Sequence, residues 1–464
     1  MSTWKFHLLT FGCKVNQYES QALREAWQRQ GGEECDDPAL ADIVCVNSCA
    51  ITAKGERDAR AALLRLRRIA PQARLVLTGC AAQLAGVLAP VRRRGAQQPQ
   101  PTADLIIPQA DKARLLDALL PSLATDGQQA PQDMTTSSVQ GFPPFAIDGF
   151  RRARPVLKVQ DGCEHRCTYC IVPLTRGRCR SREPQAILAE ARRLLRAGHA
   201  EIMISGINLR QYGRDKPEFG DFWSLLVWLD QQLAPEFAGK ARLRISSLEP
   251  GQLDSRGVDS LLSCRLVCPH LHISLQHASH QVLRRMGRGH YRAEALQQAV
   301  QALSVHWPVM GLGADIILGF PGETEADVDC LLDFVAATPF SYAHVFPYSS
   351  RPGTAAAGFA GHIAPQEKQE RARRVRDAVA RQQEAFRRAQ LALPAMLLAA
   401  DVADGQEKQR RTTGIRGVNE FYVPCRLVAP VPAMPLSGLV PVRPTGLDAS
   451  GLLVEPVETP DAIR

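Results

Sequence analysis

Residues 160–170 read Gln160-Asp161-Gly162-Cys163-Glu164-His165-Arg166-Cys167-Thr168-Tyr169-Cys170 and hold three cysteines in a C-x3-C-x2-C pattern. Three thiolates at this spacing can hold one iron–sulfur cluster and leave one of its irons without a protein ligand, free to bind a small molecule. Structural zinc is an alternative, but it usually takes four ligands, and no fourth Cys or His stands at a suitable spacing. Three unrelated thiols in one loop are a further alternative, which the density of the set disfavours.

Strand and helix patterns alternate six times around and after this run, from residue 155 to about residue 350. Six β/α units predict an open, partial (β/α)6 barrel in which the cysteine run follows the first strand. Chemistry in such barrels occurs at that C-terminal end of the strands. The expected strands are Val156–Gln160, Glu201–Ser205, Arg242–Ser246, Leu271–Leu275, Gly313–Leu318 and Tyr342–Phe346.

The first 125 or so residues also alternate between strands and helices, which predicts a small, flavodoxin-like parallel α/β sheet. The expected strands are Lys5–Thr10, Asp42–Val46, Arg74–Thr78 and Asp104–Ile107. The expected helices are Gln17–Gln30, Lys54–Ile69 and Lys112–Leu120.

Cys13, Cys49 and Cys80 each follow one of the first three of these strands. Loops after parallel strands emerge at one edge of a sheet, where α/β folds bind ligands, so the three thiols are expected to converge. A lone Cys is better read as a small buried residue, but three at one edge favour a ligand site. The remaining cysteines read as structural: Cys35, Cys45, Cys179, Cys330 and Cys425.

A spacing similar to that of zinc ligands occurs at Cys264, Cys268, His270 and His272. Both histidines, however, flank or enter the expected strand Leu271–Leu275 and share one of its faces. A packed or substrate-facing role is therefore favoured over a further metal site.

The C-terminal part of the chain begins with an Arg-rich helix expected over Gln366–Gln390. Short strand patterns then run from about residue 392 to residue 460 and predict a small β-barrel. Basic and aromatic side chains in this region could form a face that contacts RNA, although a solvated basic surface is an equal alternative. They are Arg410, Arg411, Arg416, Arg426, Phe421 and Tyr422.

The composition is that of an ordinary globular protein, with 464 residues, 45% hydrophobic and 22% charged. A net charge of +9 permits a polyanionic partner such as RNA. The 13 cysteines are odd in number and spaced for metal ligation, so a reducing, cytoplasmic location is expected. No secretion signal or membrane-length apolar run is recognised, so no membrane partner is expected.

With both cysteine sets considered, the chain resembles the radical S-adenosylmethionine (SAM) methylthiotransferases over nearly its whole length. The resembling motifs are Thr10–Ser20, Asn47–Thr52, Thr78–Gln83, Val159–Pro173, Ser205–Asn208, Arg244–Pro250, Leu271–Gln276 and Ile317–Glu323. The resemblance implies one [4Fe-4S] cluster on Cys163, Cys167 and Cys170 that binds SAM. It implies a second [4Fe-4S] cluster on Cys13, Cys49 and Cys80 that carries sulfur. Tyr169 and Gly206 are the SAM contacts expected from the barrel pattern.

The resemblance also implies a domain order: a methylthiotransferase domain over residues 1–125, a linker over 126–148, a radical SAM core over 149–388 and a TRAM-like RNA-binding barrel over 389–460. The motifs Lys14–Glu19 and Gln160–Gly162 look like the branch of the family that acts on threonylcarbamoyladenosine. The implied product is 2-methylthio-N6-threonylcarbamoyladenosine at position 37 of tRNA, beside the anticodon. The implied partners are the tRNA anticodon loop, an electron donor such as flavodoxin or ferredoxin, and a sulfur donor.

Four alternatives remain. Two lie within the same family, with isopentenyladenosine in tRNA or an aspartate of a ribosomal protein as the acceptor. The third is a non-catalytic iron–sulfur protein that binds RNA, which two open-iron sites and a six-unit barrel disfavour. The fourth is another radical SAM enzyme with an auxiliary cluster, such as a peptide-modifying one, which the TRAM-like C-terminal part and the motifs of the first domain disfavour.

Overall fold

The computed structural model describes residues 4–84, 102–117, 141–151, 153–400, 415–428 and 438–457. They fall into two compact units, each assembled from segments far apart in the sequence. The first unit combines Met1–Asp148, Gln160–Ser181 and Ser349–Ala357, and the second combines Gly149–Val159, Arg182–Tyr348 and Gly358–Arg464. The cysteine run at 163–170 therefore packs with the N-terminal residues. The domain boundaries expected from the sequence stay predictions, and most of the expected linker lies outside the described residues.

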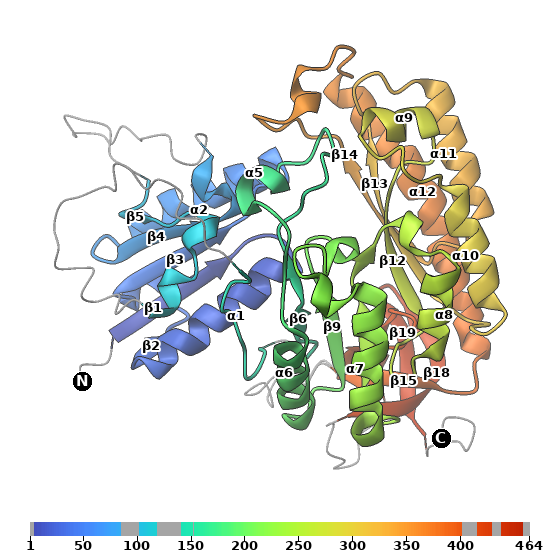
Figure 1. Ribbon diagram of the computed structural model, residues 1–464, viewed down its shortest axis with the longest axis horizontal. Coiled ribbons are helices and arrows are strands. Elements are labelled where there is room, and N and C mark those ends of the chain that lie inside the picture. The colour runs from blue at the N-terminus through green and yellow to red at the C-terminus, as the bar shows by residue number, and fades with distance from the viewer. Residues whose placement is uncertain are drawn as a thin grey trace. The chain divides into compact units, whose positions relative to one another are not determined.

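The first unit contains a five-stranded parallel sheet in the order β2-β1-β3-β4-β5, which confirms the flavodoxin-like prediction. Figure 1 shows α1 and α2 on opposite faces of this sheet. The strands are β1 (Trp4–Thr10), β2 (Gly32–Glu34), β3 (Ile43–Ser48), β4 (Arg74–Gly79) and β5 (Leu105–Ile106). The helices are α1 (Lys14–Arg29), α2 (Ala53–Ile69) and α4 (Arg114–Asp117).

Local sequence explains these elements. Every residue of β3 is buried, as expected of a central parallel strand covered on both faces. Thr52 caps the start of helix α2, since its hydroxyl accepts a hydrogen bond from the Gly55 amide. The last turn of α2 holds Arg67 and Arg68 beside the negative end of the helix dipole. The predicted helix Lys112–Leu120 is shorter within the described residues, and strand β2 was missed because three residues give too little periodicity.

The cysteine loop of the first unit is closed at its base by a short antiparallel pair, β7 (Gln160–Asp161) with β8 (Arg180–Ser181). Helix α5 (Val172–Arg176) lies between these strands in sequence. Gly162 has φ 70°, and a Cβ atom there would lie 1.8 Å from the carbonyl oxygen of Arg178. Only glycine fits this close approach. The pairing also explains why the predicted strand Val156–Gln160 is split in two.

The second unit contains the partial barrel, built from parallel strands in two sheets of order β10-β9-β6 and β11-β12-β13-β14. The strands are β6 (Val156–Lys158), β9 (Glu201–Ser205), β10 (Arg242–Ile245), β11 (Ser247–Leu248), β12 (His270–Gln276), β13 (Gly311–Leu318) and β14 (Tyr342–Pro347). The helices are α6 (Pro184–Arg196), α7 (Phe222–Phe237), α8 (Ser255–Ser263), α9 (His280–Arg285), α10 (Glu294–Ser304), α11 (Glu325–Ala337) and α12 (Pro365–Ala389). The six predicted strands are all present.

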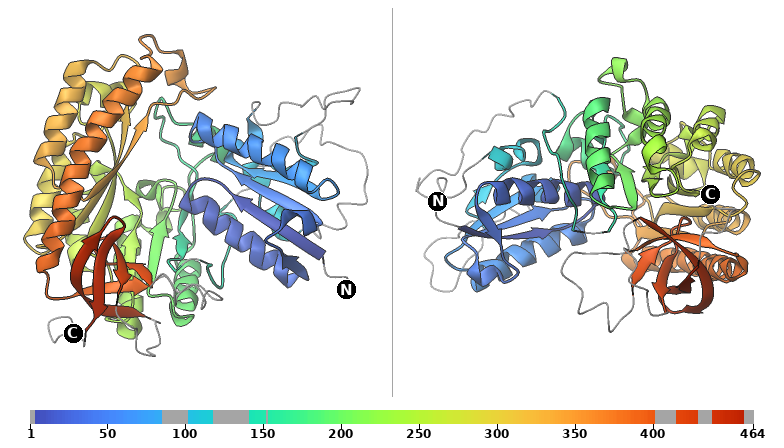
Figure 2. Two further views of the ribbon diagram at one scale, coloured as in Figure 1. Left: turned by 180° about the vertical axis from the view of Figure 1, so that it is seen from behind. Right: turned by 90° about the horizontal axis from the view of Figure 1, so that it is seen from below.

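The C-terminal residues of the second unit form a closed five-stranded barrel in the order β15-β16-β17-β19-β18, drawn in red in Figure 2. Its strands are β15 (Met396–Ala400), β16 (Arg416–Val418), β17 (Pro424–Leu427), β18 (Leu439–Asp448) and β19 (Gly451–Pro456). The predicted small β-barrel is therefore confirmed. No helix in the described part of the chain has both the length and the hydrophobicity to cross a membrane.

Candidate functional site

The N-terminal cysteines follow three neighbouring strands of one sheet. Cys13 precedes the first turn of α1, Cys49 follows β3, and Cys80 follows β4. Because β1, β3 and β4 are adjacent and parallel, all three residues lie at the same edge, as the sequence predicted. Gly12 has φ 96°, and a Cβ atom there would lie 2.7 Å from Cys49 Sγ, so the first loop needs glycine to approach the second.

The three thiols are close enough to affect one another electrostatically. Burial, together with the charges of Cys13 and Cys80, raises the pKa of Cys49 to about 11. Cys49 and Cys80 are buried, whereas Cys13 is exposed. Mutually repelling thiolates in one place are the arrangement that a bound cation stabilises, because metal ligation keeps thiols deprotonated.

The second cysteine set lines a cavity of about 630 Å³ in the same unit. Cys163, Cys167 and Cys170 all face this cavity, together with Arg166 and Arg178. The loop is held by backbone hydrogen bonds from Cys163 N to Gly177 O (3.0 Å) and from Cys170 N to Cys167 O (3.0 Å). Tyr169, an expected SAM contact, is half-buried in the turn before Cys170. A cavity edged by three thiols fits the donor set of an iron–sulfur cluster.

A buried arginine connects the loops that carry the two cysteine sets. Arg176, from α5, donates hydrogen bonds to Glu19 Oε1 (2.9 Å), to Asn16 Oδ1 (2.7 Å) and to Asp161 Oδ1 (2.9 Å). Asn16 and Glu19 lie in the first two turns of α1, after Cys13, and Asp161 precedes Cys163. The Arg176 side chain is only 1% exposed, so these contacts replace water entirely.

The charges in this network nearly cancel. Lys112 Nζ donates to Glu19 Oε2 (2.6 Å) and to Asn47 Oδ1 (2.9 Å), which brings the loop of Cys49 into the same network. Burial lowers the pKa of Lys112 despite Glu19. Burial also opposes the charge of Arg176, but the nearby Cys80, Glu19 and Asp161 hold its pKa well above the usual range. The sequence analysis gave no role to Glu19 or Lys112, and an acidic residue on the buried face of a helix was the available signal.

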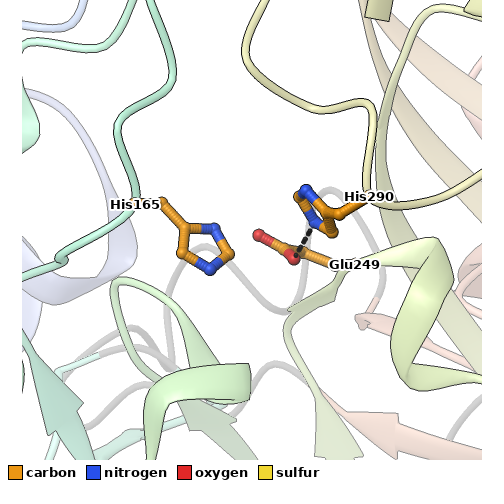
Figure 3. Close-up of side chains that lie close together, drawn as sticks. All are labelled: His165, Glu249 and His290. Atoms are coloured by element: carbon orange, nitrogen blue, oxygen red, sulfur yellow. Dashed lines mark hydrogen bonds and ion pairs between the residues drawn. The ribbon is translucent and has the colours of Figure 1, made fainter. Parts of the chain in front are cut away.

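In the second unit, polar side chains gather at the C-terminal ends of the barrel strands. Glu249, which follows β11, accepts hydrogen bonds from Asn208 Nδ2 (3.1 Å) and Arg210 (3.2 Å). Its contact with His290 Nε2 (3.2 Å) is drawn in Figure 3. Gly206, the other expected SAM contact, directly follows β9 and is half-buried. Ligands of (β/α) barrels bind at this end, so Asn208 and Glu249 are candidates that the sequence analysis did not single out.

The apparent zinc string does not form a site. His270 stacks against Tyr342, with ring centroids 5.9 Å apart and an interplanar angle of 1°. His272 instead faces Asp315, with Nε2 and Oδ1 3.6 Å apart, and its Nδ1 contacts Ser247 Oγ (2.9 Å). The two histidines thus lie on one face of β12, as the sequence predicted, and each contacts side chains of other strands in the same sheet. Cys268 is buried, and burial raises its pKa.

Only some of the residues expected to contact RNA are accessible to a ligand. Phe421 is buried in the barrel, and Arg426 forms an ion pair with Asp448 (2.7 Å). Arg416 is exposed and Tyr422 is half-buried, so these two remain accessible. Arg410 and Arg411 lie outside the described residues.

Comparison with known proteins found two matching families and many relatives. Residues 157–335 match the Radical SAM superfamily, and residues 5–94 match the Uncharacterized protein family UPF0004. Threonylcarbamoyladenosine tRNA methylthiotransferase MtaB of Bacillus subtilis is 33% identical, over 81% of this chain and 80% of its own length. MtaB of Thermotoga maritima is 34% identical, over 78% and 79%.

A second group of relatives carries a different name. The tRNA-2-methylthio-N(6)-dimethylallyladenosine synthase of Alkaliphilus oremlandii is 32% identical, over 81% of this chain and 78% of its own length. Among solved structures, the radical S-adenosylmethionine methyltransferase TsrM from Kitasatospora setae has a TM-score of 0.50 and 15% identity, covering 76% of this chain and 77% of that one. This last likeness shows a shared fold.

Proposed function

Because the chain belongs to the radical SAM family of tRNA methylthiotransferases, we propose that it adds a methylthio group to C2 of N6-threonylcarbamoyladenosine at position 37 of tRNA. The observation that carries this proposal is the pair of three-cysteine sets within one compact unit. An aromatic C–H bond is too inert for polar sulfur transfer at neutral pH. A reaction at C2 therefore needs both a radical source and a sulfur carrier.

The proposed ligands are Cys163, Cys167 and Cys170 for one [4Fe-4S] cluster and Cys13, Cys49 and Cys80 for the other. When bound, the cluster on Cys163, Cys167 and Cys170 would supply the electron that cleaves SAM, and the cluster on Cys13, Cys49 and Cys80 would supply sulfur. Within the chain, Arg176 holds the two cysteine loops, and Gly162 allows the tight turn before Cys163. Tyr169 and Gly206 remain proposed SAM contacts, to which the position of Glu249 adds a third candidate.

The proposed acceptor rests on two supports. The motifs Lys14–Glu19 and Gln160–Gly162 resemble the threonylcarbamoyl branch, and several relatives carry that name. Relatives named for dimethylallyladenosine are nearly as similar, at 32% identity, so this acceptor is the alternative within the family. A nucleotide beside the anticodon is unpaired and can be turned outward toward a protein pocket. An electron donor such as flavodoxin or ferredoxin, a sulfur donor and a cytoplasmic location belong to the same proposal.

The acceptor can be tested by incubating the reconstituted enzyme, SAM, a reductant and a sulfur source with matched tRNAs. One tRNA carries threonylcarbamoyladenosine, one carries isopentenyladenosine and one is unmodified at position 37. Nucleoside mass spectrometry should find a methylthio group only on the first. Equal reaction of the isopentenyl tRNA would overturn the acceptor but retain methylthio transfer.

A non-catalytic iron–sulfur protein that binds RNA is the alternative of another class. It predicts tRNA binding without consumption of SAM. Formation of 5′-deoxyadenosine by the reduced, reconstituted protein, measured by liquid chromatography, separates the two readings.

A further inference from the structure

A groove of about 360 Å³ lies at the open edge of the barrel in the second unit. Among the described residues, β14 pairs only with β13, so its other edge is free. The groove is lined by the start of β14, by one face of α12 and by the turn Tyr422–Pro424 of the C-terminal barrel. Figure 2 shows α12 in orange and the C-terminal barrel in red.

The helical wall of the groove is basic. Arg376, Val379, Gln383 and Arg387 all line it, at spacings that place them on one face of α12. Arg376 is exposed and Arg387 is half-buried. Neither forms an ion pair with any described residue, so both positive charges are available to a ligand.

Apart from Arg381, each of the other arginines of α12 forms an ion pair. Four of them form ion pairs with acidic residues of α12 or of the preceding residues 323–329: Arg371, Arg373, Arg374 and Arg388. Among the described residues, the arginines of α12 without an ion pair are therefore Arg376 and Arg387 at the groove and Arg381 outside it. Arg381 is exposed but does not line the groove, which makes it a matched control.

The opposite wall is aromatic and firmly held. The rings of Tyr342 and Tyr422 lie 5.4 Å apart, and the Arg244 guanidinium lies 5.0 Å from the Tyr422 ring centroid. Tyr422 has φ 68°, an uncommon conformation for a residue with a side chain. The Asn419 carboxamide oxygen stabilises this turn by accepting hydrogen bonds from Phe421 N and Val423 N. Strained residues that are held in this way often serve binding.

We propose that this groove binds a single-stranded segment of RNA, with Arg376 and Arg387 at phosphates and the tyrosines against a base. Free arginines beside aromatic faces are the combination that single-stranded nucleic acid requires. This inference rests on the proposed tRNA substrate and assigns its contact to the seam of β14, α12 and the C-terminal barrel. An acidic peptide would match the arginines but would leave the aromatic wall unused.

The test measures the affinity of the full-length, reconstituted protein for a labelled anticodon stem-loop RNA over a range of salt concentrations. Arg376→Ala and Arg387→Ala should each weaken binding several-fold and lower the slope of log affinity against log salt by about one. The double variant should lower the slope by about two. Arg381→Ala should leave both quantities unchanged.

The aromatic wall has its own variant pair. Tyr422→Leu should weaken RNA binding with little change in the salt slope, and Tyr422→Phe should bind as the wild type does, since it retains the ring. Iron content and thermal unfolding of all variants should match the wild type.

Two outcomes distinguish this inference from the proposed function. If the wild type methylthiolates tRNA and the double arginine variant binds RNA with unchanged affinity and slope, the groove assignment alone is wrong. If the wild type neither binds nor modifies tRNA, the proposed function fails as well. Preferential binding of an acidic peptide, lost in the double variant, would also overturn the RNA assignment.

Discussion

The cysteines are the residues on which the proposed chemistry depends, and the two sets predict different variant behaviour. Replacing a ligand of the second set with alanine should abolish SAM cleavage and remove about one cluster's worth of iron. Replacing a ligand of the first set should preserve some SAM cleavage but abolish methylthio transfer. The first set is Cys13, Cys49 and Cys80, and the second set is Cys163, Cys167 and Cys170. Iron analysis and 5′-deoxyadenosine formation measure both effects.

The exposed Cys330 provides the control for these variants, because Cys330→Ala should change neither quantity. Full SAM cleavage by Cys167→Ala would contradict its assignment as a ligand. Methylthio transfer by a triple variant of Cys13, Cys49 and Cys80 would contradict the cluster proposed on these three residues.

Arg176 is the residue that holds the two cysteine loops together, so its loss should affect both. Arg176→Gln removes the buried positive charge shared by Glu19 and Asp161, which keep Lys112 and, at 3.6 Å, Arg180 as cationic partners. Removing one partner from a buried ion-pair network typically costs about 3–5 kcal/mol. The variant should unfold at lower temperature and lose iron from both clusters. Arg57→Ala, at an exposed position of α2 in the same unit, should resemble the wild type. Wild-type stability and iron content in Arg176→Gln would show that the network is dispensable.

His277 gives the barrel a pH-dependent stability. It is fully buried, and burial lowers its pKa to about 4. An unfolded chain has a His pKa near 6.5, so between these values only the unfolded state gains a proton. Stability should therefore fall as the pH drops from about 6.5 to about 4, by up to about 3 kcal/mol from this group.

His277→Asn keeps an acceptor for the Ser279 amide, which His277 Nδ1 provides in the native protein (2.9 Å). This variant should show a shallower loss of thermal stability on acidification than the wild type. His306→Ala, at an exposed position, should keep the wild-type profile. Identical profiles for wild type and His277→Asn would assign the acid sensitivity to other groups.

At the scale of elements, strand β10 anchors the C-terminal barrel through two buried arginines. Arg242 donates hydrogen bonds to the carbonyl oxygens of Leu397 (2.7 Å) and Val418 (2.8 Å). Arg244 donates to those of Asn419 (3.0 Å) and Glu420 (3.1 Å). These hydrogen bonds attach the C-terminal barrel to β10, because leaving each buried carbonyl oxygen unpaired would cost folding free energy.

Glu201 of the neighbouring strand β9 neutralises both arginines. Its carboxylate accepts from Arg242 Nε (2.6 Å) and Arg244 Nε (2.6 Å). Burial opposes its charge, but the two arginines outweigh burial and hold the pKa of Glu201 well below the usual range. Glu201→Gln should therefore loosen the attachment of the barrel.

Hydrogen exchange can measure that loosening, with faster exchange expected in β15 and β16. Glu236→Gln is the control, because its ion pair with Arg196 is exposed and should contribute little. Unchanged exchange in Glu201→Gln would show that the carbonyl contacts alone hold the barrel.

At the scale of the whole molecule, the C-terminal barrel contributes to the stability of the second unit. Deleting the residues after Gln390 would remove the carbonyl acceptors of Arg242 and Arg244. The truncated chain should unfold at lower temperature than the full chain, as measured by calorimetry. A loss of tRNA affinity in that variant would not locate the RNA site, whereas the point variants of the groove do. An unchanged unfolding temperature would contradict this role of the barrel.

Much of the fold was predictable because its signals are local. Six β/α patterns gave the barrel strands, and strand ends followed by Cys13, Cys49 and Cys80 gave the shared edge of the first sheet. The three-residue strand β2 was missed because period-two alternation needs more residues to be recognised. The assembly of residues 160–181 with the N-terminal sheet was also not predicted, since no local pattern encodes it.

The sequence by itself determined the ligand chemistry of this protein, because cysteine spacing and strand–helix alternation are properties of neighbouring residues. Only the tertiary structure decided which charges meet. Arg176 and Glu19 are 157 residues apart and Arg242 and Val418 are 176 apart, yet both pairs are in hydrogen-bond contact. It also decided that Arg376 and Arg387 form no ion pair with any described residue, whereas Arg426 pairs with Asp448. Such contacts depend on packing between distant segments, and that packing determines which polar groups lose water and must find a partner.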